Sequence, residues 1–441
     1  MKIYAVGGYD LVGKNMTIVD FGKKAIVFDV GLNMEGYTKL TENQPQDKIK
    51  KLLTEKNLVK YDAIPNLTPF RHILNKVEVI VLTHAHLDHI GALPFLYKHF
   101  KNVVVLGTPY TIEILKSLFY DLNLKPSNLI LKKIPPNSSI VINNMLIEFI
   151  YITHSTPQTI VAKVTHENET VMYANDFKLD PMPVLGGKVN YKALTDAKPD
   201  ALILDSTRVE LLGKTPSESL VEPMLREIIE LPNLRNKGII ATTFSSHIAR
   251  LFTLKKIGKR LKRKVYFLGR SMHKYIKAAE KIGLINFSDV EVVRFKSKIR
   301  RILKQAQKNP KDYFLVVTGH QGEPGSILVE MTTNWKFNFN DFYVIFSCSK
   351  IPTPTTEANR AFLESKLKEM HVPFFTDVHV SGHASREDLR SFINIINPNL
   401  VVPAHGDAAK RSKLASLAKE ENFKVVLLDE GDVVEIEKQK K

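Results

Sequence analysis

Short apolar runs alternate with stretches of helical periodicity along most of the chain. This alternation is typical of an α/β protein, in which helices cover a sandwich or a wound sheet. Several apolar runs are followed at once by an acidic residue or a histidine. These strand-end residues are Asp29 in KAIVFDVG, His84 in VEVIVLTH, His154 in IEFIYITH, Asp176 in TVMYAND, Asp205 in ALILDST and His405 in NLVVPAHGD. Since open sheets bind ligands beyond the carboxyl ends of their strands, we expect the six side chains to converge on one site.

The segment VLTHAHLDHIGALP, residues 81–94, places four polar side chains directly behind one of these runs. His84 and His86 point the same way on an extended stretch, because side chains alternate with a period of two. The following residues predict the start of a helix, with Asp88 in capping position and His89 in the first turn. Two histidines would then aim at one metal ion, and Asp88 with His89 at a second point nearby. A buried core would have to satisfy all four polar groups, which favours a metal site.

Composition restricts both the metal and the class of protein. Cys348 is the single cysteine, which excludes an intramolecular disulfide and a thiolate metal cage. Imidazole and carboxylate ligands suit Zn²⁺, with Mn²⁺ as the alternative. With 441 residues, 44% of them hydrophobic and 25% charged, the chain is expected to form two globular domains. No apolar run approaches the roughly 18 residues of a membrane helix, and the N-terminal apolar stretch is too short for a signal peptide, so we expect a cytoplasmic location.

The net charge of +17 is concentrated in one part of the chain. Residues 250–311 contain 20 Lys and Arg against three acidic residues, so the remainder is formally neutral. Such a segment is typical of a surface that faces a polyanion. A solvated helical face in a Lys-rich protein is the alternative interpretation.

The motifs together resemble those of the metallo-β-lactamase superfamily. THAHLDHIGA is similar to its HxHxDH signature, and Asp29, His154, Asp176 and His405 follow the order of its other motifs. The resemblance extends to the nucleic-acid-processing β-CASP branch, with Asp205 in motif A, His383 of VSGHAS in motif B and His405 in motif C. VVTGHQGEPGS, VIFSCSKIP and TTFSSHIARL are similar to segments of the ribonuclease J family, most of all its short archaeal type.

This resemblance implies an α/β fold in which a metallo-β-lactamase αββα sandwich is interrupted by an inserted α/β β-CASP domain. The order of the motifs agrees, because the ligands of the first 180 residues are followed by none until His405. The expected boundaries are 1–204 for the first part of the metallo-β-lactamase domain, 205–375 for the β-CASP domain and 376–441 for the second part.

The resemblance also implies roles for individual residues. His84, His86 and His154 would bind one of two Zn²⁺ ions, Asp88, His89 and His405 the other, and Asp176 both. Asp29 would orient a ligand from behind. Asp88, Asp176, Asp205 and His383 would be catalytic, His383 contacting the scissile phosphate and Asp205 positioning it. Contacts with RNA or phosphate are expected at Ser246, Gly319, Gln321, Gly322, Ser347, Ser381, Gly382 and His383.

The function implied by the resemblance is a 5′-to-3′ exoribonuclease that prefers RNA with a 5′-monophosphate. An RNA endonuclease of the 3′-end-processing type is the nearest alternative. A non-nucleolytic metallohydrolase such as a thioesterase leaves the basic segment unexplained, and a silent RNA-binding subunit would not need all seven ligands. RNA is the expected partner, and family analogy adds a homodimer and an RNA-decay helicase. The chain departs from the family at IPTPTTEANR, where IPGNE is usual, and because it stops shortly after the last expected zinc ligand, we do not expect tetramer-type assembly through the further C-terminal domain of bacterial members.

Overall fold

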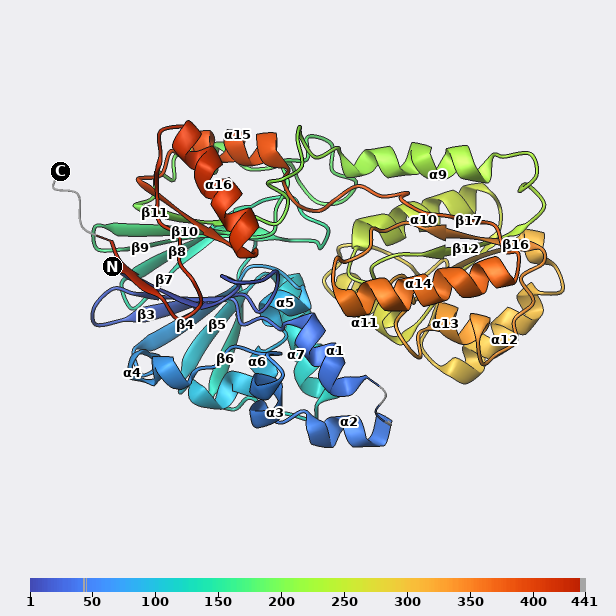
Figure 1. The fold of residues 1–441 in the computed structure, drawn as a ribbon, viewed down its shortest axis with the longest axis horizontal. Coiled ribbons are helices and arrows are strands. Elements are labelled where there is room, and N and C mark those ends of the chain that lie inside the picture. The colour runs from blue at the N-terminus through green and yellow to red at the C-terminus, as the bar shows by residue number, and fades with distance from the viewer. Residues whose placement is uncertain (43, 45, 437–441) are drawn as a thin grey trace. The chain divides into compact units, whose positions relative to one another are not determined.

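The computed structural model describes residues 1–436 except 43 and 45 (Figure 1). Packing divides the chain into two compact units. Unit 1 contains Met1–Pro181, Gly186–Thr215 and Gly382–Lys441, and unit 2 contains Met182–Leu185 and Pro216–Ser381. The domain boundaries expected from the sequence, at 205 and 375, stay a prediction. None of the described helices has both the length and the apolar character needed to cross a bilayer.

Unit 1 contains two seven-stranded sheets. The first has the order β20-β1-β2-β3-β4-β5-β6, in which β3 to β6 are parallel. The second has the order β19-β18-β11-β10-β9-β8-β7, in which β10, β11, β18 and β19 are parallel. The strands of the first sheet are β1 (Lys2–Gly7), β2 (Met16–Asp20), β3 (Ala25–Phe28), β4 (Val77–Leu82), β5 (Val103–Gly107), β6 (Leu129–Lys133) and β20 (Val433–Glu435). Those of the second are β7 (Ser138–Ile142), β8 (Met145–Tyr151), β9 (Ile160–His166), β10 (Glu169–Ala174), β11 (Ala201–Asp205), β18 (Leu400–Ala404) and β19 (Lys424–Val425).

The two sheets of unit 1 pack face to face around one hydrophobic core. Phe28 from β3 stacks on Tyr173 from β10 with ring centroids 5.0 Å apart, and both side chains are fully buried. Helices cover the outer faces, with α15 and α16 on the second sheet and α4, α6 and α7 on the first (Figure 1). The helices are α1 (Met34–Thr41), α2 (Gln46–Leu52), α3 (Glu55–Lys60), α4 (Arg71–Leu74), α5 (Leu87–Ile90), α6 (Leu93–Leu96), α7 (Pro109–Asp121), α8 (Tyr191–Thr195), α15 (Arg386–Ile396) and α16 (Ala408–Glu420). This layering is the αββα sandwich that was predicted.

Unit 2 is built on one parallel sheet with the order β14-β13-β15-β12-β16-β17. Its central strands are apolar and fully buried, as is usual for a parallel sheet with helices on both faces. The strands are β12 (Gly238–Thr242), β13 (Lys264–Leu268), β14 (Glu291–Val293), β15 (Tyr313–Val317), β16 (Phe342–Phe346) and β17 (Phe374–Phe375). The helices are α9 (Val221–Ile229), α10 (Ile248–Arg260), α11 (Arg270–Lys281), α12 (Lys296–Ala306), α13 (Ile327–Thr332) and α14 (Pro354–Glu369).

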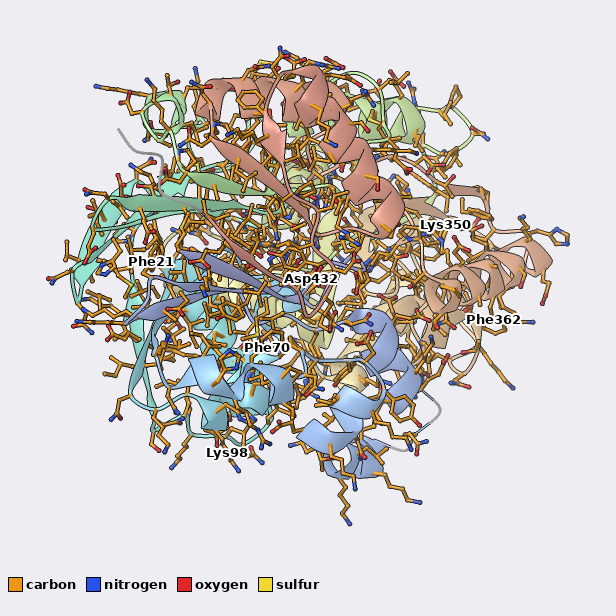
Figure 2. All side chains as sticks on the ribbon, turned by 60° about the vertical axis from the view of Figure 1, so that its left-hand side comes forward. Phe21, Phe70, Lys98, Lys350, Phe362 and Asp432 are labelled. Carbon is orange, nitrogen blue, oxygen red and sulfur yellow. The ribbon has the colours of Figure 1, made fainter. Side chains whose placement is uncertain are left out.

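Short-range patterns account for several of these elements. In α12 the buried residues Ile299, Ile302, Leu303 and Ala306 follow the helical period, and the remaining face is basic. The start of α15 is stabilised by a capping box between Ser385 and Asp388. Apolar side chains make up the buried layers, and Lys98 lies at the surface (Figure 2). An α/β sandwich with an inserted α/β unit therefore matches the predicted fold class.

Candidate metal centre

Six strands of unit 1 deliver polar side chains to one region. In the first sheet, β3 and β4 are parallel neighbours and lead into Asp29 and His84. In the second sheet, β8, β10, β11 and β18 run in one direction, because β8 and β10 are both antiparallel to β9. Their carboxyl ends lead into His154, Asp176, Asp205 and His405. Since the sheets face each other, strand ends that are remote in sequence become neighbours.

One group of side chains consists of His84, His86, His154 and Asp176. The Nε2 atoms of His84 and His154 each lie 3.5 Å from Oδ2 of Asp176. Nδ1 of His86 lies 3.1 Å from Nε2 of His84, 3.2 Å from Nε2 of His154 and 4.0 Å from Oδ2 of Asp176. Ligands of a tetrahedral Zn²⁺ ion are separated by about 3.3 Å when the metal–ligand bonds are about 2.0–2.1 Å long. These four atoms therefore fit around one ion of that size.

A second group consists of Asp88, His89, Asp176 and His405. Nε2 of His89 lies 3.3 Å from Oδ1 of Asp176 and 3.6 Å from Oδ2 of Asp88. Nε2 of His405 lies 2.8 Å from the same Oδ1 and 3.8 Å from Oδ2 of Asp88. Asp176 thus presents one carboxylate oxygen to each group.

Hydrogen bonding supports a metal at these groups. Oδ1 of Asp176 and both ring nitrogens of His405 are buried and form no hydrogen bond of acceptable geometry with a described residue, although Nε2 of His405 lies only 2.8 Å from that Oδ1. Such atoms are costly to bury unless a ligand satisfies them. Nitrogen and carboxylate oxygen are suitable donors for Zn²⁺ and Mn²⁺. The side chains present in the two groups therefore fit a divalent metal.

Burial sets the charge of the rings in the first group. It lowers the pKa of His84 to about 3 and that of His154 well below the ordinary value. Both rings are therefore uncharged near neutral pH, which is the form in which imidazole binds metals. Burial alone would raise the pKa of Asp176, but the facing rings of His405 and His89 hold it well below the usual range. The shared carboxylate is consequently ionised.

Residues behind the groups fix the orientation of the rings. Nδ1 of His89 donates to Oδ2 of Asp29 at 2.7 Å, and Asp29 also accepts from the amide and hydroxyl of Thr83. Nδ1 of His154 donates to the carbonyl oxygen of Gly382 at 2.7 Å. In both rings Nε2 is thereby turned toward the groups, an arrangement that is usual for metal-binding histidines.

One local prediction is wrong. His86, not Asp88, is the N-cap of α5, because its backbone is extended and its carbonyl accepts from the amides of His89 and Ile90. The helix therefore begins at Leu87, and Asp88 lies in its first turn. Because the Asp88 carboxylate does not cap the helix, it is free to face His89 and His405.

The backbone at the site is strained at three strand ends. Asp29, Asp176 and His405 have φ angles of 56°, 56° and 54°, in the left-handed region that residues other than glycine rarely adopt. Each such residue costs on the order of 1 kcal/mol, which the surrounding packing must offset. All three follow a strand directly or after one residue, and the left-handed turn redirects the side chain into the site.

His383 and Asp205 lie together beside the first group. Nδ1 of His383 is 3.1 Å from Oδ2 of Asp205 and 3.0 Å from the hydroxyl of Thr207, while Nε2 is 3.9 Å from Oδ2 of Asp176. Burial alone would lower the pKa of His383, but Asp176 and Asp205 raise it to about 9. The two carboxylates thus favour the protonated form of the ring.

Sequence reasoning missed several residues that support the site. Asn15 donates through Nδ2 to the carbonyl of Asp88 and lies 3.1 Å from Nε2 of His89. Gly31 packs directly against the backbone of Asp88, and a Cβ atom at Gly31 would lie 1.6 Å from the carbonyl oxygen of Asp88. Asn15 ends the glycine-containing segment GGYDLVGKN behind β1, and this composition behind a strand was the available signal.

The predicted RNA contacts between residues 246 and 347 lie on loops at the carboxyl ends of β12, β15 and β16 in unit 2. Two of their side chains have other partners. Ser347 donates to the carbonyl of Val378 and accepts from Arg250, and Gln321 bonds the backbone of Ser349 and Ile351. A Cβ at Gly322 would lie 2.2 Å from the carbonyl oxygen of Asn359. Gly319 has a positive φ, Ser246 is buried, and Ser381 and Gly382 lie just before His383.

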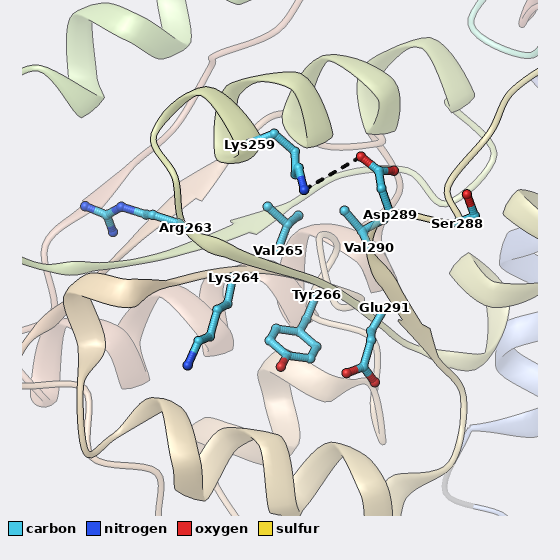
Figure 3. Close-up of a pocket in the computed structure, with 9 residues that line it drawn as sticks. All are labelled: Lys259, Arg263, Lys264, Val265, Tyr266, Ser288, Asp289, Val290 and Glu291. Carbon is cyan, nitrogen blue, oxygen red and sulfur yellow. Dashed lines mark ion pairs between the residues drawn. The ribbon is translucent and has the colours of Figure 1, made fainter.

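A separate pocket in unit 2 lies at the amino ends of β13 and β14 (Figure 3). It is lined by Lys259, Arg263, Lys264, Val265, Tyr266, Ser288, Asp289, Val290 and Glu291. Its acidic residues are paired, Asp289 with Lys255 and Lys259 and Glu291 with Lys298. None of its lining residues belongs to a group that could hold a metal ion.

The αββα sandwich and the two histidine and aspartate groups at its strand ends define a metal-binding hydrolase fold of the metallo-β-lactamase class. Family profiles agree: "Metallo-beta-lactamase superfamily" matches residues 9–236, "Ribonuclease J, beta-CASP domain" matches 236–363, and "Zn-dependent metallo-hydrolase RNA specificity domain" matches 375–428. The chain belongs to the ribonuclease J family, which confirms the resemblance found in the sequence.

Two archaeal relatives match over nearly the full length. Ribonuclease J of Pyrococcus abyssi is 38% identical, over 99% of this chain and 97% of the relative. Ribonuclease J of Methanocaldococcus jannaschii is 36% identical, over 99% of each chain. Ribonuclease J of Helicobacter pylori is 29% identical over 99% of this chain but 61% of its own length. A crystal structure of a protein of unknown function from Enterococcus faecalis V583 shares the fold, with a TM-score of 0.67, 17% identity and coverage of 98% and 99%.

Proposed function

We propose that the protein is a metal-dependent ribonuclease that hydrolyses phosphodiester bonds of single-stranded RNA. The observation that carries this proposal is the pair of histidine and aspartate groups sharing Asp176, in a chain of the ribonuclease J family. The match to an RNA specificity domain over residues 375–428 and the basic segment 250–311 support RNA as the substrate.

The cofactor proposed is two Zn²⁺ ions per chain, with Mn²⁺ as the alternative. His84, His86 and His154 would hold one ion, Asp88, His89 and His405 the other, and Asp176 both. When bound, such ions make water a stronger nucleophile and offset charge that develops on a phosphate. Chelation is expected to abolish cleavage while RNA binding persists, and a fully chelated protein that still cuts RNA would exclude the proposal.

His383 is proposed to contact the scissile phosphate and to donate a proton to the leaving oxygen. Its contact with Asp205 supports this role, because a general acid must be oriented before reaction. His383→Ala is expected to lower kcat by roughly 10²- to 10⁴-fold. Metal content measured on the same preparation should stay at the wild-type level, which separates this role from metal binding.

The direction of cleavage is proposed to be 5′ to 3′, with a preference for a 5′-monophosphate. The test is gel analysis of 5′-labelled linear RNA, carrying either a monophosphate or a triphosphate, incubated with the wild-type chain and with His86→Ala. Immediate release of labelled mononucleotide, faster from the monophosphate and absent in the variant, is the expected result. Cleavage that persists in His86→Ala would contradict the metal assignment.

An endonuclease of the 3′-end-processing type is the competing activity. It would yield fragments of intermediate length that do not depend on the 5′ end, and it would open a circular RNA that an exonuclease cannot enter. The boundaries 1–204, 205–375 and 376–441, the RNA contacts in unit 2, the homodimer, the helicase partner and the cytoplasmic location stay predictions.

A further inference from the structure

Phe295 is an exposed aromatic residue at the carboxyl end of the outer strand of unit 2. It follows β14 and forms the N-cap of α12, and 60% of its surface is accessible. The guanidinium of Arg294 lies over its ring, 4.5 Å from the centroid. Exposure of a phenylalanine ring to water does not stabilise the fold. An aromatic ring with a guanidinium stacked over it is, however, typical of surfaces on which nucleic acid bases stack.

Positive charge surrounds this ring. On its exposed face α12 carries Lys296, Lys298, Arg300, Arg301 and Lys304, and the helix contains no acidic residue. Lys296 pairs with Glu330 and Lys298 with Glu291, and Arg300 lies over the ring of Trp335 at 4.8 Å. Among the described residues, no carboxylate lies within ion-pair distance of Arg294, Arg301 or Lys304. The surface around Phe295 therefore keeps unbalanced positive charge.

The two ends of β14 differ in charge. At its amino end, Asp289 and Glu291 accompany the lysines of the pocket in Figure 3. At its carboxyl end, the guanidinium of Arg294 lies over the ring of Phe295, and no carboxylate of the described residues forms an ion pair with it. Polyanion affinity is thus expected at the carboxyl end, where an aromatic face is also available.

The ring also shares an edge of the sheet with the loops of the ribonuclease J motifs. In the order β14-β13-β15-β12, two strand spacings separate β14 from β15 and three separate it from β12. Strands lie about 4.8 Å apart, so the carboxyl end of β14 is roughly 10 Å from that of β15, which leads into Gly319, and about 14 Å from that of β12, which leads into Ser246. A few nucleotides of a single strand can span such distances, whereas one nucleotide cannot.

We propose that Phe295 and Arg294 form a stacking platform for one base of single-stranded RNA, with the cations of α12 attracting the adjacent phosphates. The proposal rests on the proposed function, since it assigns a binding position to that same substrate. Single-stranded RNA is favoured over a protein partner because aromatic rings stack on any base, and the excess of 20 basic over three acidic residues in 250–311 complements a polyanion.

The test is fluorescence anisotropy of a labelled single-stranded RNA with the full chain, in EDTA so that no RNA is cut. Phe295→Ala is expected to weaken binding by roughly 5- to 100-fold, as alanine substitutions at base-stacking rings do. Phe295→Trp should keep the RNA affinity of the wild type, because the larger aromatic ring can still stack on a base. The matched control is Phe362→Ala, which removes an exposed ring near a lysine on α14 (47% exposed, Lys366 at 5.8 Å; Figure 2) and should bind as the wild type does.

Salt and a ligand without bases separate stacking from charge. Phe295→Ala should leave the slope of log Kd against log salt unchanged and should not affect binding of inorganic polyphosphate. Arg294→Ala should weaken the binding of both RNA and polyphosphate. It should also reduce the salt-dependence slope for RNA by about 0.7 per lost phosphate contact. Equal RNA affinities of the wild type and Phe295→Ala, or equal losses for RNA and polyphosphate, would overturn the platform. A wild-type chain that binds no RNA would instead overturn the proposed function.

Discussion

Nδ1 of His89 donates a hydrogen bond to Oδ2 of Asp29 at 2.7 Å, and both side chains are completely buried. The same carboxylate accepts two hydrogen bonds from Thr83. In Asp29→Asn, an amide NH₂ would replace one of the two carboxylate oxygens, so that it would face the N–H of His89 or Thr83 instead of accepting from it. Metal affinity of the group that contains His89 is expected to fall by about 10- to 100-fold, which competition with a chromogenic chelator measures. Asp289→Asn, at an exposed aspartate of unit 2, is the control and should leave affinity unchanged.

Asp88 and Asp176 are expected to differ in how much metal their loss removes. Asp88 belongs to one group, whereas Asp176 gives Oδ1 to one and Oδ2 to the other. With two ions per chain, Asp88→Asn should lower the metal content by one and Asp176→Ala should lower it toward zero, as measured by mass spectrometry of the metal after gel filtration. Wild-type metal content in Asp176→Ala would contradict the shared-ligand assignment.

Gly31→Ala is expected to disturb the site without altering a ligand. The added Cβ would lie 1.6 Å from the carbonyl oxygen of Asp88, a backbone atom that cannot move alone. We expect a loss of about 3 kcal/mol in the free energy of unfolding together with weaker metal binding. Gly187→Ala is the matched control, because its Cβ would meet only a ring carbon of Tyr151 at 3.8 Å. Thermal unfolding with and without metal compares the two, and equal melting temperatures would refute the steric argument.

The buried ion pair between Arg250 and Glu218 is expected to stabilise unit 2. Arg250 binds both carboxylate oxygens of Glu218, at 2.6 and 2.8 Å, and also the carbonyl of Ser347. Arg250→Leu would remove the guanidinium that binds both oxygens of this buried carboxylate and should cost about 3–5 kcal/mol. Arg260→Leu breaks the exposed pair with Glu222 and should cost at most about 1 kcal/mol. Urea unfolding distinguishes them, and similar midpoints for both variants would argue against a buried pair.

His320 gives the stability of unit 2 a dependence on pH. Burial lowers the pKa of His320 below 6.5, and Arg360 adds to this effect although Glu323 opposes it. The unfolded chain therefore binds the proton first as the pH falls. The stabilisation is fully present above about pH 6.5, the ordinary value, and is lost as the pH falls toward the lower folded-state pKa. When the pH is lowered from 7.5 to about 5, the urea midpoint of the wild type should fall more than that of His320→Gln. Parallel plots of the midpoint against pH for the two proteins would contradict this role of His320.

Much of the fold follows from short-range patterns. The apolar runs that end at Asp29 and His84 are strands β3 and β4, and the inference that side chains gather at strand ends held for both sheets. The spacing of His84 and His86 also predicts their common group. The prediction of Asp88 as the cap of α5 was wrong. Capping depends on the backbone conformation of His86, which residue types alone do not reveal.

The motifs and apolar runs of the chain are enough to predict the family, the αββα class and the residue types available to a metal. The contacts between particular atoms follow from the three-dimensional packing. Nε2 of His405 lies 2.8 Å from Oδ1 of Asp176, and Asn15 and Gly31 lie against the backbone carbonyl of Asp88. His405 reaches the site because β18 pairs with β11 after the whole of unit 2 has intervened. Strand order and the packing of two sheets depend on contacts between residues far apart in the chain, and local periodicity does not encode such contacts.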